Sequence, residues 1–122
     1  MRRAQFERLV ARALDELPPR FAERLGNVAV IVEARPSREV AGELGGDILG
    51  LYQGASEAEQ SPMAPYELPE IIVIYQSNIE AICRTDDEVV AEVRKTVIHE
   101  VGHHFGLTDD QMEAWEAEAG DE

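Results

Sequence analysis

Apolar residues recur at helical spacing near the start of the 122-residue chain. Such a pattern, with polar residues between, is typical of an amphipathic helix, which we predict over residues 3–17 and expect Pro18 and Pro19 to end. A short helix is predicted in "RFAERL", ending at Gly26 in the left-handed conformation that glycine adopts easily. The apolar positions of the first helix are Phe6, Leu9, Val10, Ala13, Leu14 and Leu17.

A second helical pattern begins after the capping box Thr85-x-x-Glu88 and predicts a helix over residues 86–105, followed by Gly106. At about 100° per residue, its apolar side chains fall within roughly half the circumference and form the core face. A second box, Thr108-x-x-Gln111, predicts a short C-terminal helix with Met112 on its packed side. The apolar face of the long helix comprises Val89, Val90, Val93, Val97, Ile98, Val101 and Phe105.

Three segments between the helices have strand character: residues 27–34, 47–54 and 70–75. The third, "EIIVIY", is apolar enough for a central strand, and Gly50 in the second indicates a bulge or a close backbone approach. Residues 54–69 contain three prolines and no periodic pattern. A long segment of this kind is either a functional lid or a tolerated insertion.

This order of elements predicts an α+β fold in which a small mixed sheet of three to four strands packs against helices. The length fits one domain over residues 1–122, and 44% hydrophobic residues are enough for a core. Acidic residues outnumber basic ones by 25 to 11, giving a formal charge of −14. Nucleic acid and anionic membranes are therefore not expected as partners, because both require clustered positive charge.

The single cysteine, Cys83, excludes an internal disulfide and is expected to be a packed thiol rather than a nucleophile. The charged N-terminal segment lacks a signal-peptide core, and the longest apolar run, "IIVIY", is too short to cross a bilayer. We therefore expect a cytoplasmic protein, without inferring its oligomeric state.

The chain's three histidines all lie in "TVIHEVGHHFGLTDDQ". His99 and His103 are one helical turn apart, opposite the core face, so both imidazoles can reach one metal ion. Glu100 projects to another side, where it can reach a metal-bound water. His104 falls on the apolar arc and is expected to pack or cap. The alternative for the pair is ordinary polar helix surface, since H-E-x-x-H also occurs by chance.

A catalytic zinc site uses three protein ligands and a water, so a third ligand is needed beside the two histidines. Gly106 allows the chain to leave the helix sharply, and Asp109 completes the spacing H-E-x-x-H-x-x-G-x-x-D. Asp109 also suits the first turn of the next helix, where a carboxylate complements the helix dipole, and Asp110 fits that role equally well. The spacing favours Asp109 as ligand over Asp110.

The segment "HEVGHHFGLTDD", together with the preceding "LPEIIVIYQSNIEAI", resembles the small bacterial zincin-like metallopeptidase family over about residues 25–115. The resemblance is to metzincin-type sites with Asp as third ligand. It implies a sheet packed on a backing helix and an active-site helix, and one zinc ion bound by His99, His103 and Asp109. Glu100 would be the general acid/base of peptide-bond hydrolysis, acting on a peptide or unfolded protein.

Two features separate the chain from larger zincins. Only 13 residues follow Asp109, where larger members carry a lower subdomain with a Met-containing turn. Met112 follows too soon to be its equivalent and is expected to be core. No oxyanion-stabilising residue stands out among Tyr52, Tyr66 and Tyr75. A metal-binding interaction module with little or no proteolytic activity is therefore the alternative to a peptidase.

A peptide substrate is expected to add as a strand along the edge formed by residues 47–53. A hydrolase acting on RNA is disfavoured, because too few basic residues are present to hold phosphates. Nitrogen and carboxylate ligands would accept other first-row ions besides zinc.

Overall fold

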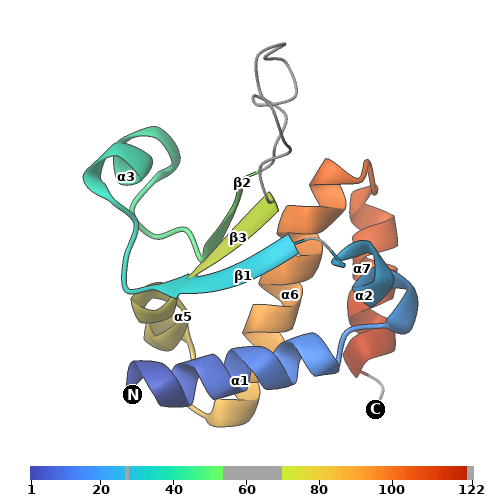
Figure 1. The fold of residues 1–122 in the computed structure, drawn as a ribbon, viewed down its shortest axis with the longest axis horizontal. Helices are drawn as coiled ribbons and strands as arrows, with labels where there is room; N and C mark the ends of the chain where they lie inside the picture. Colours follow the sequence, from blue (N-terminus) through green and yellow to red (C-terminus); the bar gives the residue numbers. More distant parts are fainter. Residues whose placement is uncertain (27, 54–69, 121–122) are drawn as a thin grey trace.

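The computed structural model describes residues 1–26, 28–53 and 70–120, with the side chains of 103, 104 and 118–120 outside the description. The fold is mixed α+β, as the sequence predicts (Figure 1). Its elements in chain order are α1 (Arg3–Asp15), α2 (Pro19–Arg24), β1 (Val28–Glu33), α3 (Arg38–Leu44), β2 (Gly50–Gln53), β3 (Glu70–Tyr75), α5 (Gln76–Ile82), α6 (Asp86–His104) and α7 (Asp109–Gly120).

The three strands form one mixed sheet in the order β1-β3-β2. β1 pairs with β3 in parallel, with Val30 opposite Ile72, whereas β2 pairs with β3 antiparallel, with Leu51 opposite Val73. The apolar β3 is therefore the central strand, as its composition predicts. β2 is an edge strand, so one side of its backbone is not paired within the described sheet.

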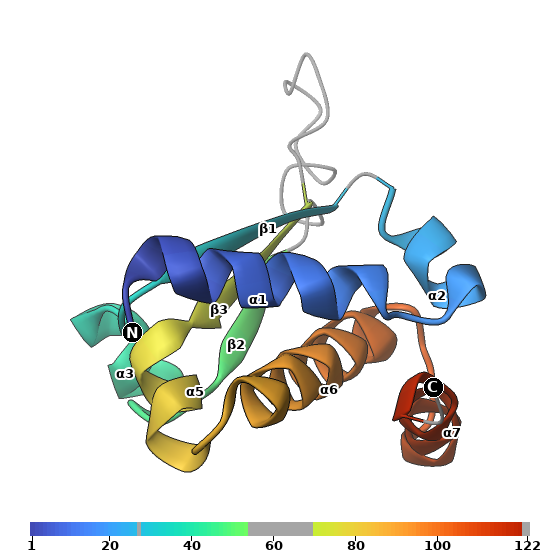
Figure 2. The same ribbon diagram turned by 90° about the horizontal axis from the view of Figure 1, so that it is seen from below.

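α1 and α6 lie beside each other on the same face of the sheet (Figure 2). Alternation along β3 directs Ile72 and Ile74 to this face, where they join the buried side chains of both helices. The predicted apolar face of the long helix is confirmed, with Phe105 only partly buried. The helical members of this core are Phe6, Leu9, Val10 and Ala13 from α1, and Val89, Val90, Val93, Val97, Ile98 and Val101 from α6.

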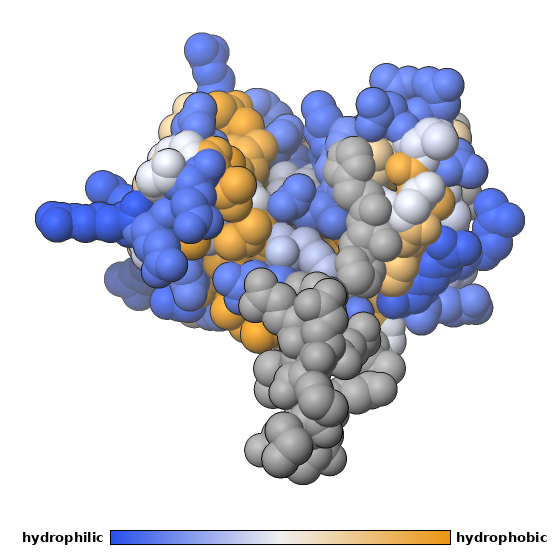
Figure 3. All heavy atoms as spheres, turned by 90° about the horizontal axis from the view of Figure 1, so that it is seen from above, coloured by the Kyte–Doolittle hydropathy of each residue, from blue (hydrophilic) through white to orange (hydrophobic). Residues whose placement is uncertain are grey.

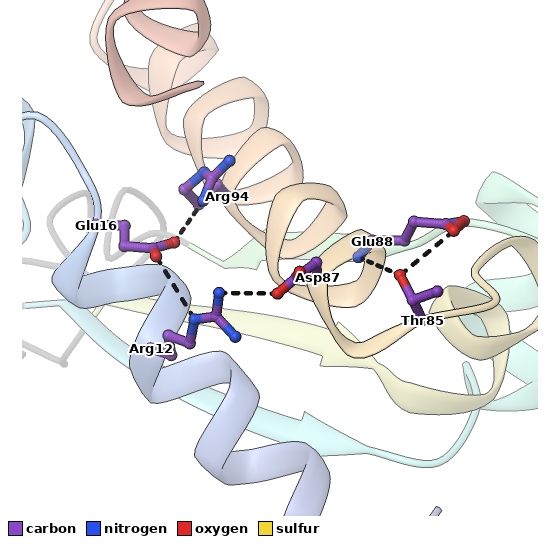
Figure 4. Close-up of polar contacts among 6 residues, drawn as sticks. All are labelled: Arg12, Glu16, Thr85, Asp87, Glu88 and Arg94. Carbon is purple, nitrogen blue, oxygen red and sulfur yellow. Dashed lines mark hydrogen bonds and ion pairs between the residues drawn. The ribbon is translucent and has the colours of Figure 1, made fainter. Parts of the chain in front are cut away.

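A chain of ion pairs also joins α1 to α6 (Figure 4). Arg12 donates to Asp87 at 2.9 Å and lies 3.5 Å from Glu16, which in turn contacts Arg94 at 2.5 Å. The hydrogen bond to Asp87, the largest cause, raises the pKa of Arg12. These ion pairs connect the two packed helices, although exposed pairs of this kind contribute little stability.

Both predicted capping boxes are present. Thr85 Oγ1 accepts a hydrogen bond from the backbone N–H of Glu88, and the carboxylate of Glu88 accepts from the N–H of Arg84. At α7, the N–H of Gln111 donates to Thr108 Oγ1, while the N–H of Thr108 donates to Gln111 Oε1. The two bonds at α7 are reciprocal, whereas at α6 the Glu88 carboxylate binds the N–H of Arg84, the residue before the cap.

The turn between α6 and α7 is built around Gly106, which has a φ of +76°. The N–H of Leu107 donates to the carbonyl of Gly102 at 2.9 Å, which is the six-to-one bond of a Schellman motif. The sharp exit predicted at Gly106 is confirmed, and it turns the chain back so that α7 packs against α6.

Three details differ from the sequence-based expectation. Gly26 does not have a positive φ, so the predicted left-handed cap there is wrong. The short helices α3 and α5 were not predicted. No residue of α3 is buried and only Ile79 of α5 is, so neither helix has the apolar stripe that reveals an amphipathic helix.

Within the described residues, no helix is both long enough and apolar enough to cross a membrane.

Candidate metal centre

His99 and Glu100 line one pocket of about 420 Å³, which lies between α6 and the edge strand β2. His99 is 36% exposed at its side chain, and Glu100 is partly buried. The remaining α6 residues of the lining, Glu92, Lys95 and Thr96, lie on the turns before them. An imidazole and a carboxylate from neighbouring positions of α6 therefore line the same pocket.

The opposite wall of the pocket is apolar. It comes from the end of α3, the segment before β2 and β2 itself, and consists of Leu44, Ile48, Leu49, Gly50 and Leu51. Figure 3 shows apolar surface gathered in a strip on the side of α3, beside polar surface. One wall of the pocket thus carries a histidine and a carboxylate, and the opposite wall is apolar enough to contact the hydrocarbon part of a ligand.

Asn78 of α5 holds the segment that forms this apolar wall. Its side-chain amide donates to the carbonyls of Gly46 at 3.0 Å and Ile48 at 2.7 Å. The N–H of Tyr75 donates to the carbonyl of Leu49 at 3.0 Å and extends the pairing beside β2. The wall is therefore anchored to the end of the central strand, which limits its movement relative to α6.

A carboxylate from α7 meets the other side of His99. Glu116 Oε1 lies 2.5 Å from His99 Nε2, and the Glu116 side chain is 23% exposed. Oε1 is buried and accepts no hydrogen bond from any described residue.

Glu116 reaches His99 because α7 is docked firmly at two places. Met112 is fully buried and lies over Gly102 of α6, where an added Cβ would stand 2.6 Å from its sulfur. Trp115 packs edge-on against Phe21 of α2, with ring centroids 5.3 Å apart. Met112 is therefore a core residue, as expected.

Asp109 and Asp110 both lie in the first turn of α7 and are exposed. In this position their carboxylates complement the positive end of the helix dipole. Their placement neither brings them into the described pocket nor decides between them as ligands. Glu116 was not among the residues that the sequence indicated. The available signal was its position four residues after Met112, on the side of α7 that packs against α6.

His103 lies on α6 one turn after His99, but its side chain and that of His104 are outside the described residues. The predicted convergence of two imidazoles and the predicted packing of His104 therefore remain predictions. Among side chains that the structure does describe, no three His, Cys, Asp or Glu residues form a group able to hold a metal ion.

The tyrosines considered as oxyanion partners are placed away from this pocket where they are described. Tyr75 is 1% exposed, and burial raises the pKa of its phenol. Tyr52 packs against the core, and its hydroxyl oxygen is buried. Neither lines the pocket, and Tyr66 lies outside the described residues.

Cys83 also packs partly against the core, as expected. Burial, followed by the charges of Glu92 and Glu88, raises the pKa of its thiol. A thiol with a raised pKa is poorly ionised at neutral pH, which is the opposite of an activated nucleophile.

Residues of the types that bind zinc lie near one another here, although the described side chains form no complete set of ligands. His99 Nε2 and the buried Glu116 Oε1 are a nitrogen and an oxygen donor placed head to head, and the backbone of α6 carries His103 one turn further. Imidazole and carboxylate are the ligand types that catalytic zinc sites use. The orphaned carboxylate oxygen beside a ring nitrogen is the observation on which this fit depends.

A comparison with protein families matches the model of the zincin-like metallopeptidases over residues 25–119. Among solved structures, the chain is similar to a conserved hypothetical protein from Thermo thermophilus, with 28% sequence identity and a TM-score of 0.54. That match covers 84% of this chain and 92% of the other. No curated protein matches the chain. The family match extends over most of the chain and includes α6 and α7, so this protein belongs to the zincin-like metallopeptidase family.

Proposed function

We propose that this protein is a zinc-dependent peptidase that hydrolyses peptide bonds through a water molecule activated between the metal and Glu100. One observation supports this most directly: His99 and Glu100 line the same pocket beside β2, an edge strand of the sheet that the described residues form. Membership of the zincin-like family supports the same chemistry.

The metal would be held by His99, His103 and one carboxylate, for which the spacing of the motif indicates Asp109. Zinc, when bound, lowers the pKa of a coordinated water to near 7 and polarises a scissile carbonyl. The protein's net charge of −14 disfavours a phosphodiester substrate, which favours peptides over nucleic acids.

Glu100 is proposed as the general acid/base. It lies next to His99 on α6 and is directed toward the wall of the pocket that β2 completes. A carboxylate in this position accepts a proton from the attacking water and later donates it to the leaving amine.

The substrate would be an extended peptide that adds to β2 as a further strand. Edge strands present backbone N–H and C=O groups that bind extended chains in this way. A peptide on this edge would pass along the pocket, with a side chain against Leu49 and Leu51 and its backbone toward Glu100. Binding through the backbone would make the enzyme tolerant of sequence outside that side chain.

Two variants test the proposal together. Glu100→Ala should bind zinc as the unaltered protein does but lose at least about a hundredfold in cleavage of a peptide library, which is the usual scale for a general base. His99→Ala should lose both zinc and cleavage. Activity in Glu100→Ala equal to the unaltered protein would remove the proposed base.

The same experiment separates the peptidase from a metal-binding interaction module. Zinc bound at His99 with no cleavage of any library peptide would favour the module. Elemental analysis of protein purified without a histidine tag would identify the metal acquired in the cell, since the ligand types also accept other first-row ions.

A further inference from the structure

We infer that Lys95 of α6 selects peptides that carry a carboxylate close to the bond that is cleaved. This inference rests on the proposed function, because it names the chemical class of substrate for the same pocket. Lys95 is the only lysine of the chain, and it lines the pocket together with His99 and Glu100. A positive charge therefore stands beside the two motif residues, although the motif does not call for one.

No ion pair within the described part of the fold accounts for this charge. Lys95 is exposed, and its ammonium group pairs with no carboxylate of the described residues. The neighbouring Arg94 differs, since it contacts Glu16 at 2.5 Å and connects α6 to α1. The nearest acidic residue on the same helix face is Glu92, one turn earlier, and an exposed pair at this spacing contributes little stability. The ammonium group is thus available to a ligand in the pocket.

The position of Lys95 on α6 determines where it would contact a substrate. Lys95 and His99 are one helical turn apart on the same stripe, which is about 6 Å along the helix axis. An extended peptide advances about 3.3 Å per residue, so this separation corresponds to about two residues of substrate. The flexible four-carbon stem of lysine allows the ammonium group to reach adjacent positions as well. The carboxylate that it binds would lie about two residues from the bond at His99 and Glu100.

The rest of the pocket indicates what accompanies that carboxylate. The wall opposite α6 contains Leu49 and Leu51 and is anchored to Asn78 of α5. The pocket volume of about 420 Å³ is in the range of sites that bind small organic ligands. With a net charge of −14, the protein as a whole repels carboxylates, so a local cation is needed to bind one. The substrate class is therefore a peptide segment with an apolar side chain next to a carboxylate.

A peptide offers such a carboxylate from two sources, its C-terminal end or the side chain of Asp or Glu. Both present the same pair of oxygens to an ammonium group, and a charge-assisted hydrogen bond forms equally well with either. Recognition of the C-terminal end would restrict cleavage to the last few residues of a chain. Recognition of an acidic side chain would allow cleavage at internal positions.

The experiment compares three fluorescently labelled peptides that share one apolar sequence. The first has a free C-terminus, the second is amidated, and the third is amidated with one Gln replaced by Glu. Fluorescence anisotropy measures the affinity of each for the zinc-loaded Glu100→Ala protein, which is expected to bind peptides without cleaving them. The kcat/KM of the protein with Glu100 intact is measured for the same peptides.

Lys95→Met keeps a side chain of similar length and removes its charge. It should weaken binding of at least one carboxylate-bearing peptide about fivefold, the upper scale of an exposed ion pair, and leave the amidated peptide within about twofold. Lys95→Arg keeps the charge and should retain most of the affinity. Arg84→Met is the matched control, because Arg84 is exposed, lies outside the pocket lining and loses the same charge. It should leave all three affinities within about twofold.

The outcomes separate this inference from the proposed function. A loss confined to the free C-terminus or to the Glu peptide identifies the source of the carboxylate. Equal losses for all three peptides in Lys95→Met would overturn the inference, and so would unchanged affinities or a failure of both carboxylate-bearing peptides to bind. If the zinc-loaded protein with Glu100 intact cleaved no peptide, the proposed function would fail, while the affinities would still report whether Lys95 selects carboxylates.

Discussion

Gly50 of β2 lies directly against Thr96 of α6. A Cβ added to Gly50 would stand 2.6 Å from Thr96 Cγ2 and 3.0 Å from the carbonyl oxygen of Val73. Both residues line the pocket that contains His99 and Glu100. Because Gly50 has no side chain, β2 lies close to α6, and the width of the pocket depends on this distance.

Gly50→Ala should destabilise the protein by about 1–3 kcal/mol, because the added methyl group overpacks a contact with backbone on one side. Urea denaturation measures this change. Gly42→Ala is the matched control, since nothing lies within 4 Å of its added Cβ, and it should be neutral or slightly stabilising.

Thr96→Ser tests the same contact from the side of α6. It removes Cγ2 but keeps the hydroxyl that donates to the carbonyl of Glu92. In the double variant with Gly50→Ala, the destabilisation should be less than the sum of the two single changes by about 0.5–1 kcal/mol. Strict additivity would show that the contact with Thr96 does not limit the approach of β2.

Leu51→Glu should reduce kcat/KM for library peptides at least tenfold. The substitution places a carboxylate in the apolar wall of the pocket, opposite Glu92 and Glu100, where a substrate's apolar side chain would otherwise bind. Gln53→Glu adds the same charge at an exposed position of the same strand and should have little effect. Equal losses in the two variants would mean that the effect is one of overall charge rather than of this wall.

The phenol of Tyr75 predicts a pH dependence of stability. Burial, and secondly the charge of Glu33, raise its pKa above the ordinary value of 10.0. In the unfolded chain the phenol ionises near pH 10, whereas the folded protein keeps its proton, so the stabilising contribution is present below about pH 10 and is lost as the pH rises further.

Urea denaturation between about pH 9 and 11 tests this dependence. Tyr75→Phe keeps the buried ring and removes the titrating group, so its stability should fall less over this range than that of the unaltered protein. Parallel curves for the two proteins would show that Tyr75 is not the group responsible.

The sequence predicted best those features that depend on neighbouring residues. The capping boxes at Thr85 and Thr108 and the turn at Gly106 are local chemistry, and all three are confirmed. The apolar stripe of α6 predicted its core face, because six of its side chains are almost completely buried in a single cluster. Gly50 was predicted to mark a bulge or a close backbone approach, and the structure shows a close approach to Thr96 and Val73.

The rest depends on contacts between distant segments. α3 has no buried residue, so no periodic apolar pattern in the sequence predicts this helix. The contact of Glu116 with His99 arises only when Met112 and Trp115 have docked α7, and its residue type alone does not distinguish it from the exposed Glu113. The spacing of the motif identifies residues within α6 and the turn that follows it. It does not identify a side chain that α7 brings into contact with α6.

The aromatic contact between Phe21 and Trp115 should influence metal binding although neither residue is a ligand. Phe21 is fully buried in α2, and its ring packs against Trp115 of α7, the helix whose first turn carries Asp109. Phe21→Leu preserves an apolar side chain but loses the edge-to-face contact, which contributes about 0.5–1.5 kcal/mol beyond burial. α7 should become less firmly docked, and zinc affinity should fall several-fold.

Phe6→Leu is the control, because Phe6 is equally buried but belongs to α1, on the sheet side of the core. Both variants should lose about 1–2 kcal/mol of stability in urea denaturation, as large apolar residues do when they are replaced by smaller ones. A loss of this size leaves nearly all molecules folded, so it does not by itself weaken binding to the folded state. A zinc affinity that is reduced in Phe21→Leu but not in Phe6→Leu would therefore show that the metal site depends on the docking of α7. Equal affinities would show that the metal site does not depend on how this helix is docked.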